Sequence, residues 1–147
     1  MLNHMKKIDP KQTIFYTIEN AIKTYRKFAQ QQISEEMSGI TVDQMLVLTA
    51  LEANPDIAQN EMAELLFKDY ASITRMVELL VKNDYLSRAI NKVDRRKFVL
   101  NITSKGHHTL KKLKPIILKN RTDALKGVSE SEVNQMFSTL NKIINNC

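Results

Sequence analysis

The segment from Tyr70 to Gly106 constrains the fold of this chain more than any other. It holds a short amphipathic helix pattern, then two alternating strand patterns separated by the Arg-rich loop 91–96. Thr103 follows, a residue type that commonly caps the start of a helix. The segment therefore predicts a helix packed beside a small basic β-hairpin.

Two short helices are predicted ahead of this hairpin, at 59–67 and 70–83, because apolar residues recur there at helical spacing. The apolar residues expected to face the core are Met62, Leu65 and Leu66 in the first helix and Ile73, Met76, Val77 and Leu80 in the second. Only Lys68 and Asp69 separate the two helices, which is typical of a helix-turn-helix.

The hairpin strands are predicted at 85–90 and 97–102, where apolar and polar residues alternate. The intervening loop contains no glycine. Tight two-residue hairpin turns need positive φ angles, for which glycine is the usual residue. We therefore expect a longer, protruding loop of the kind called a wing.

Longer helices are predicted on both sides of this region. The first begins at Asp9-Pro10 and ends near Ser34, with Ile14, Ile18, Ile22, Tyr25 and Ala29 on one face. A capping box at 41–44 opens a helix that is apolar over most of its circumference and ends at 54–56.

The helix that follows Thr103 contains Pro115, so a kink or break is expected just before that residue. A second capping box at 129–132 opens the last helix, whose apolar stripe is Val133, Met136, Phe137, Leu140, Ile143 and Ile144. The predicted fold is mainly α with a small β-hairpin wing, in one domain over 1–147. A small domain with several long helices needs a partner to bury its apolar surface, so we expect a homodimer.

Positive charge is concentrated in one part of the chain. The formal net charge is +6, but the segment 82–121 alone holds twelve lysines and arginines against two aspartates. Such a concentration is typical of a surface that meets nucleic-acid phosphates. For Lys111, Lys112 and Lys114 a solvated helix face is an equal alternative.

The helix 70–83 offers the best candidates for contact with DNA bases. With its apolar residues turned to the core, Ala71, Arg75, Glu78 and Lys82 point the opposite way, and Ser72 and Thr74 lie on the flanks. Arginine can bind guanine through two hydrogen bonds in the major groove. Any exposed helix can carry such residues, so the prediction depends on the hairpin that follows.

In the wing, the candidate contacts are Lys92, Asp94, Arg95, Arg96 and Lys97. Asp94 is close enough along the chain to orient the Arg96 guanidinium, and a fixed arginine on a projecting loop suits a narrow minor groove. The alternative is an exposed ion pair that stabilises the turn by well under ~1 kcal/mol. Such a weak pair does not explain why three basic residues adjoin at one tip.

The runs 72–80, 85–88, 94–96 and 100–106, taken together, resemble the MarR (multiple antibiotic resistance regulator) family of winged helix-turn-helix proteins. The likeness extends over nearly the whole chain. It implies a regulator that reads a double-stranded, pseudo-palindromic operator and usually represses. Arg75, with Ser72 and Thr74, would enter the major groove, and Arg96, held by Asp94, the minor groove.

The resemblance also implies a dimer built from helices within 9–40 and 104–147, around a winged helix-turn-helix lobe at 41–103. One departure is Asp84, which stands where many members have glycine. Aspartate tolerates the left-handed backbone better than most residues, so we expect a small local cost and an unchanged fold.

Members of the family commonly respond to small effectors, often aromatic or anionic, or to oxidants. Tyr16, Tyr25, Phe28 and Met45 are the candidate pocket residues, although residues at helical spacing are more often plain core. Cys147 is the only cysteine, so neither a disulfide nor oxidant sensing through paired thiols is expected. Neighbouring His107 and His108 diverge by about 100° on a helix and do not suggest a metal site.

No cofactor and no enzymatic activity are predicted, because no phosphate-binding glycine loop or nucleophile and base pair is recognisable. A winged-helix module for protein or RNA contact, without a specific operator, is the alternative function. No apolar run is long enough for a membrane span, and 1–8 lacks the apolar core of a signal peptide. A cytoplasmic location is therefore expected.

Overall fold

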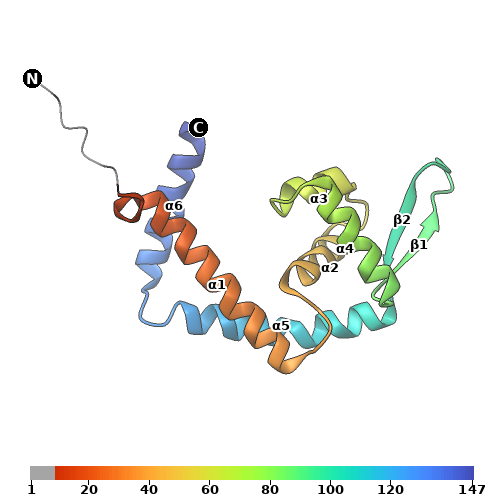
Figure 1. Ribbon diagram of the computed structural model, residues 1–147, viewed down its shortest axis with the longest axis horizontal. Helices are drawn as coiled ribbons and strands as arrows, with labels where there is room; N and C mark the ends of the chain where they lie inside the picture. The colour runs from red at the N-terminus through yellow and green to blue at the C-terminus, as the bar shows by residue number, and fades with distance from the viewer. Residues whose placement is uncertain (1–8) are drawn as a thin grey trace, which may run out of the picture.

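The computed structural model describes residues 9–147, which form six α-helices, a short 3₁₀ turn and a two-stranded antiparallel hairpin (Figure 1). The signal-peptide prediction concerns 1–8 and lies outside the described residues. The elements in chain order are η1 (Pro10–Gln12), α1 (Ile14–Glu36), α2 (Val42–Ala53), α3 (Gln59–Leu65), α4 (Tyr70–Lys82), β1 (Leu86–Ile90), β2 (Phe98–Ile102), α5 (Ser104–Ala124) and α6 (Glu130–Asn146). The predicted fold class is confirmed.

The start of the first helix differs from the prediction. Asp9 caps only the 3₁₀ turn η1, and Thr13 interrupts the helix with an extended backbone. The Thr13 hydroxyl then accepts a hydrogen bond from the Tyr16 N–H at 3.2 Å, which caps α1. A second capping residue close behind the first therefore divides the N-terminus into a turn and a helix, and α1 continues to Glu36.

α2 is the centre of the hydrophobic core. Its capping box is present as predicted, with the Thr41 hydroxyl and the Gln44 side chain each bound to the other's backbone N–H. Val47 and Leu48 have no exposed surface. The helix packs against α1, α4, α5 and β2, and so fixes the position of the two DNA-reading candidates, α4 and the hairpin.

The junction between α4, β1 and α5 is held by a left-handed residue and a glycine. Asp84 has φ +64°, the left-handed backbone that the sequence analysis anticipated at this position. Its carbonyl accepts a hydrogen bond from the Thr103 hydroxyl, which also caps α5 by accepting from the Gly106 N–H. A Cβ at Gly106 would collide with the Tyr85 carbonyl, so only glycine allows α5 to begin this close to β1.

Of the kink or break predicted just before Pro115, the break is wrong, because α5 continues as helix from Ser104 to Ala124, and the kink stays a prediction. Proline removes one backbone hydrogen bond from a helix. Here Leu113 on one side of it and Asn120 on the other are buried, and Ile116 and Ile117 pack against the core. We attribute the continuity of the helix to this packing.

α5 runs along the molecule and connects two regions (Figure 1). One region contains α2, α3, α4 and the hairpin. The other contains the N-terminal half of α1 and all of α6, which extend away from that lobe. α6 has no buried residue, and its apolar Met136, Phe137 and Ile144 are more than half exposed.

Candidate nucleic-acid interface

The helix-turn-helix consists of α3, the turn 66–69 and α4. The turn is closed by backbone hydrogen bonds, including the Lys68 N–H to the Ala63 carbonyl at 2.8 Å, and Phe67 within it has φ +55°. Lys68 also forms an ion pair with Asp43 at the start of α2, at 3.2 Å. α4 is thereby fixed at its N-terminus to the rest of the lobe.

α4 has the two faces that the sequence predicts. Ile73, Val77 and Leu80 are completely buried, and Met76 packs against the core. The side chains on the outer face are exposed, and the flanking Ser72 and Thr74 are half-buried; the outer residues are Ala71, Arg75, Glu78 and Lys82. The helix therefore presents one polar surface to solvent along its whole length.

Asp69, Ser72 and Arg75 form a chain of contacts along the outer side of α4. One Asp69 oxygen accepts the Ser72 backbone N–H at 2.7 Å, and the other accepts the Ser72 hydroxyl at 3.0 Å. The Arg75 Nη2 lies 3.5 Å from the Ser72 hydroxyl oxygen. The Ser72 N–H and hydroxyl, and then the Arg75 charge, lower the pKa of Asp69, so its carboxylate is ionised at neutral pH.

Thr74 has a different role from that of Ser72. Its hydroxyl donates to the Tyr70 carbonyl at 3.0 Å and lies 3.4 Å from the Gln59 side-chain oxygen on α3. This half-buried hydroxyl thus connects the two helices of the helix-turn-helix. Only part of its surface is available to a nucleic acid.

The hairpin is shaped by Asn91 and Asp94. The Asn91 side chain accepts the backbone N–H groups of Val93 and Asp94, and the Asn91 backbone N–H donates to the Lys97 carbonyl at 3.0 Å. The predicted contact between the Asp94 carboxylate and the Arg96 guanidinium is wrong. Asp94 instead accepts the Arg96 backbone N–H at 3.0 Å, because the turn brings that donor within reach two residues later.

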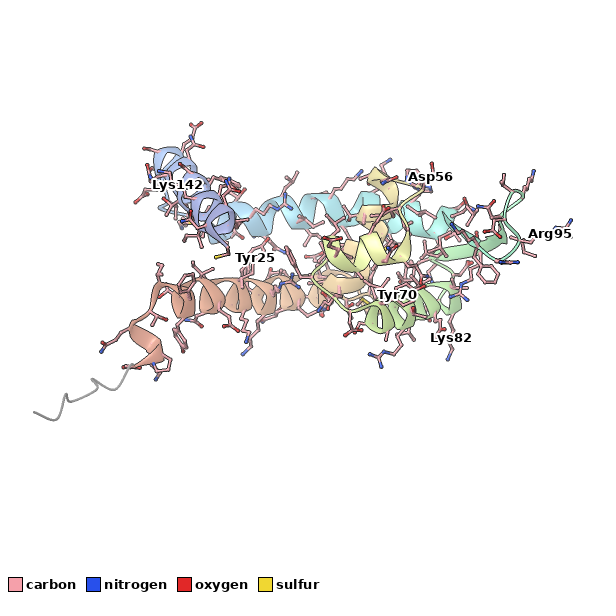
Figure 2. The ribbon with its side chains drawn as sticks, turned by 90° about the horizontal axis from the view of Figure 1, so that it is seen from above. Tyr25, Asp56, Tyr70, Lys82, Arg95 and Lys142 are labelled. Atoms are coloured by element: carbon pink, nitrogen blue, oxygen red, sulfur yellow. The ribbon has the colours of Figure 1, made fainter. Side chains whose placement is uncertain are left out.

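The basic side chains of the wing are left exposed. Among the ion pairs between described residues, none includes Arg75, Lys82 or a basic residue of the loop, which carries Lys92, Arg95, Arg96 and Lys97. Figure 2 shows Tyr70 and Lys82 towards the two ends of α4 and Arg95 at the hairpin tip. The lobe thus presents positive charge from a helix and from a neighbouring loop.

Several exposed residues near this surface were missed by the sequence analysis. Phe67 in the turn is 90% exposed and Tyr70 at the start of α4 is 58% exposed. Arg88 on β1 lies over the Phe98 ring at 5.7 Å from its centre. An aromatic residue that directly follows a predicted turn, or shares a strand pair with arginine, was the available signal.

Leu65 is wrongly predicted to face the core, since it is 56% exposed. The buried residues of α3 are Met62 and Ala63, with Leu66 packed against them. At about 100° per residue, these three centre the buried side away from Leu65. The sequence analysis did not count Ala63 among the core residues because its side chain is small.

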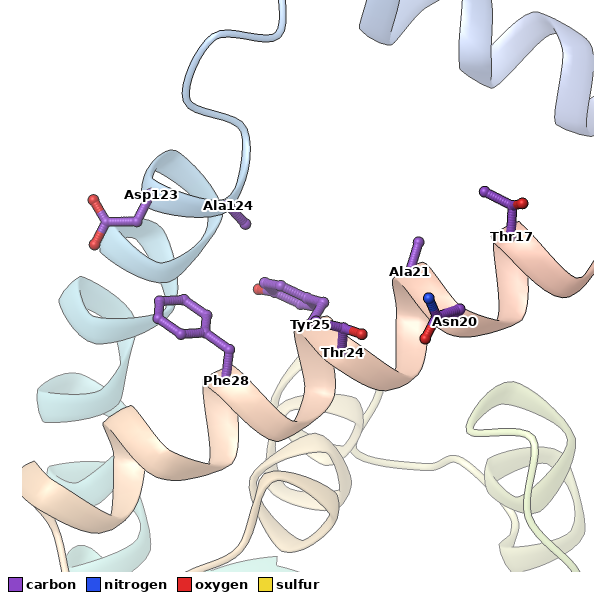
Figure 3. A pocket seen from close by; sticks show the side chains of 8 residues that line it. All are labelled: Thr17, Asn20, Ala21, Thr24, Tyr25, Phe28, Asp123 and Ala124. Carbon is purple, nitrogen blue, oxygen red and sulfur yellow. The ribbon is translucent and has the colours of Figure 1, made fainter. Parts of the chain in front are cut away.

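The predicted pocket residues are distributed over different places. Tyr25 and Phe28 line an open groove of about 710 Å³ between α1 and the end of α5 (Figure 3). Met45 is buried, and it lines a smaller cavity of about 150 Å³ that Tyr25 also borders. Tyr16 lines neither. The groove further contains polar side chains, namely Thr17, Asn20, Thr24 and Asp123.

Within the part of the chain that the structure describes, no three His, Cys, Asp or Glu side chains gather as a metal site would require. His107 and His108 are both exposed on α5. Likewise, none of the described helices has the length and apolar character needed to cross a membrane.

Residues 38–97 match the sequence model of the MarR family. That segment begins before α2 and contains α3, α4, β1 and the wing loop. The match therefore covers the helix-turn-helix lobe and the wing loop of this chain. Over a longer range, the chain is 24% identical to the HTH-type transcriptional regulator BilQ of Clostridium symbiosum, across 90% of both proteins.

Solved structures resemble the chain beyond this matched segment. BpsR of Bordetella bronchiseptica, studied for regulation of its DNA binding by 6-hydroxynicotinic acid, has a TM-score of 0.82 at 20% identity, covering 92% of this chain and 96% of its own. A cysteine-to-serine mutant of MarR from E. coli, in complex with operator DNA, has a TM-score of 0.80 at 21% identity, covering 88% and 92%. The helices outside 38–97 therefore also follow the MarR fold.

Proposed function

We propose that this protein is a homodimeric transcriptional regulator that binds a pseudo-palindromic DNA operator and represses the adjoining genes. The observation that carries the proposal is the pairing, on one MarR-family lobe, of an outward helix face containing Arg75 with a basic wing. α4 would read base edges in the major groove, and the wing would place Arg96 or Arg95 in the minor groove.

The wing can do this although Asp94 does not hold the Arg96 guanidinium. Asp94 and Asn91 instead fix the loop backbone, and the arginine side chains remain exposed donors at its tip. Loop arginines that are free of protein partners can adapt to phosphates or to a narrow groove. The role proposed for Asp94 is therefore to shape the loop.

Dimerisation is supported by apolar surface that the single chain leaves open. Ile14 and Phe15 in α1 and Phe137 and Ile144 in α6 are each at least 60% exposed. Exposed apolar surface of this extent is unusual in a monomer and marks an interaction surface. Two copies joined through α1 and α6 would carry two α4 helices to successive major grooves, about 34 Å apart.

A small effector is proposed for the groove between α1 and α5. Its walls combine the aromatic Tyr25 and Phe28 with hydroxyl and amide groups, a composition that suits a small aromatic molecule with polar substituents. The regulation of BpsR by 6-hydroxynicotinic acid is a precedent in a structural relative. The groove borders the helices proposed for the dimer, so a ligand there would alter the separation of the two lobes.

The proposed role involves no catalysis, and it would be carried out in the cytoplasm, where operator DNA is located. A winged-helix module for RNA or protein contact is the second candidate. The exposed aromatic Phe98, at the start of β2 beside the wing, gives it some support, because RNA-binding surfaces stack bases on aromatic rings.

Selection of bound duplexes from a random pool tests the proposal. We expect a palindromic consensus, and we expect the Arg75→Ala, Arg96→Ala double variant to lose it. Competition with structured RNA at physiological salt separates the second candidate, since RNA should not displace the selected duplex. A pool that yields no consensus would overturn the operator proposal. Displacement of the duplex by small aromatic acids then tests the groove.

A further inference from the structure

Ser72 on α4 has a hydroxyl whose hydrogen is already committed. It donates to the Asp69 carboxylate at 3.0 Å, while the other carboxylate oxygen holds the Ser72 backbone N–H at 2.7 Å. A hydroxyl has a single hydrogen and two acceptor lone pairs. Arg75 Nη2 donates to one of these lone pairs at 3.5 Å. Towards any molecule that approaches the outer side of α4, Ser72 therefore offers only its remaining acceptor lone pair.

An acceptor distinguishes the bases in the major groove. Adenine and cytosine present amino groups there, whereas guanine and thymine present acceptors without an amino group; adenine carries the N7 acceptor as well. Ser72 in its observed state can bind only an amino group. Arg75 lies one helical turn further along the same side and offers the opposite chemistry, donors that match guanine.

We propose that Asp69 determines base preference by fixing the direction of the Ser72 hydroxyl, so that the position next to the base read by Arg75 must carry an adenine or cytosine amino group. The inference rests on the proposed function, because it needs α4 in the major groove. Asp69 is a positioning residue, and it acts on DNA through Ser72.

The choice of aspartate at this position supports a role beyond helix capping. Serine, threonine and asparagine cap a helix about as well as aspartate does, and Thr41, Thr103 and Ser129 cap α2, α5 and α6. A carboxylate on a DNA-binding surface is repelled by phosphates. Among these residues, only aspartate provides a second acceptor oxygen with no hydrogen of its own, which the Ser72 hydroxyl requires.

The decisive variant is Asp69→Asn. The amide oxygen can still cap the Ser72 N–H, but the amide NH₂ would then face the Ser72 hydroxyl and donate to it. The hydroxyl hydrogen is thereby released and can point to the base. The released hydroxyl can donate as well as accept, so we expect Asp69→Asn to relax the preference at this one position until guanine and thymine are selected beside adenine and cytosine, with the rest of the consensus retained.

A base analogue gives an independent measurement. If adenine is selected, its replacement by purine, which lacks the amino group, should weaken wild-type binding about fivefold, the value of one neutral hydrogen bond. If cytosine is selected, it is replaced by the pyrimidinone that lacks the amino group, and the same loss of affinity is expected. Ser72→Ala and Asp69→Asn should show no such loss. Asp69→Ala is the control for capping alone, since it should lower stability more than Asp69→Asn does.

An unchanged base preference in Asp69→Asn would overturn the inference, as would equal sensitivity of wild type and Ser72→Ala to loss of the amino group. Both results leave the operator proposal standing. Failure of the wild-type protein to select any duplex would instead remove the operator proposal, and this inference with it.

Discussion

Lys68, in the turn before α4, and Asp43, at the start of α2, form an ion pair of 3.2 Å, and the same carboxylate receives Arg26 of α1 at 3.3 Å. One side chain thus connects a helix that borders the groove to the turn that orients α4. All three side chains retain about a third of their exposure, so the bridge is screened by solvent.

We predict that Asp43→Asn lowers the free energy of unfolding by less than about 1 kcal/mol, as for other partly exposed pairs. Operator affinity should fall by more than this change in stability explains, because the turn before α4 loses its anchor. Urea denaturation and duplex titration measure the two effects. Glu19→Gln, which removes the exposed Lys23 pair elsewhere on α1, is the matched control. Equal operator affinity in both variants would contradict the anchoring role.

Gly106→Ala should destabilise the whole lobe. The added methyl carbon would lie 2.6 Å from the Ile102 Cγ2 atom and closer still to the Tyr85 carbonyl oxygen, and backbone cannot move aside cheaply. Overpacking of this kind costs about 1–3 kcal/mol. His108→Ala, at an exposed position two residues further along α5, should leave the urea midpoint unchanged. Matching midpoints for the two variants would show that α5 can shift to relieve the contact.

The cap of α4 should weaken in acid. The Ser72 hydrogen bonds and the Arg75 charge lower the folded-state pKa of Asp69 below its ordinary value of 3.8. A lowered pKa means that the stabilisation is complete above about pH 4–5 and is lost as the pH falls through the folded-state pKa. The difference in melting temperature between wild type and Asp69→Asn should therefore shrink between about pH 5 and pH 2. A constant difference over this range would contradict the proposed hydrogen bonds.

Local sequence patterns predicted the features that depend on near neighbours. Capping boxes at Thr41 and Ser129 and the two-faced α4 require only residues a few positions apart, so they were readable. Features set by tertiary packing could not be predicted from such local patterns. Pro115 is tolerated within α5 because residues on both sides of it pack against the core. Leu65 is exposed because burial of Ala63 turns the buried side of α3 away from it.

In the wing, the sequence did not show whether Asp94 binds a side chain or the backbone. The pattern Asp94-x-Arg96 suggests an ion pair, but the nearest donor in the folded turn is the Arg96 backbone N–H. Side chains of Asp and Asn commonly bind the backbone two residues ahead in turns. Spacing alone therefore placed the two residues together without identifying which atoms meet.

Substitution of the apolar face of α6 should dissociate the dimer without unfolding the lobe. Phe137→Glu places a charge on a side chain that is 65% exposed in the single chain, so the core loses no contact. In the proposed interface the same charge would be buried without a partner. Sedimentation should show a monomer, and duplex affinity should fall steeply. Lys142→Glu, at an exposed polar position of α6, is the matched control and should remain dimeric.

Arg75 and Arg96 should contribute differently to operator binding. A phosphate or minor-groove contact at the wing adds to the release of counterions, so Arg96→Ala should reduce the slope of log affinity against log salt by about one. The loss of affinity in Arg96→Ala should be similar for operator and random duplexes.

Arg75→Ala should weaken binding by about 1–3 kcal/mol on the operator alone and relax the preference at a single base pair. Titrations at several salt concentrations on both duplexes distinguish these outcomes. Lys23→Ala, exposed on α1, controls for the loss of one charge. Identical salt slopes for wild type and Arg96→Ala would show that this arginine makes no phosphate contact, and Arg95→Ala would then be the variant expected to reduce the slope.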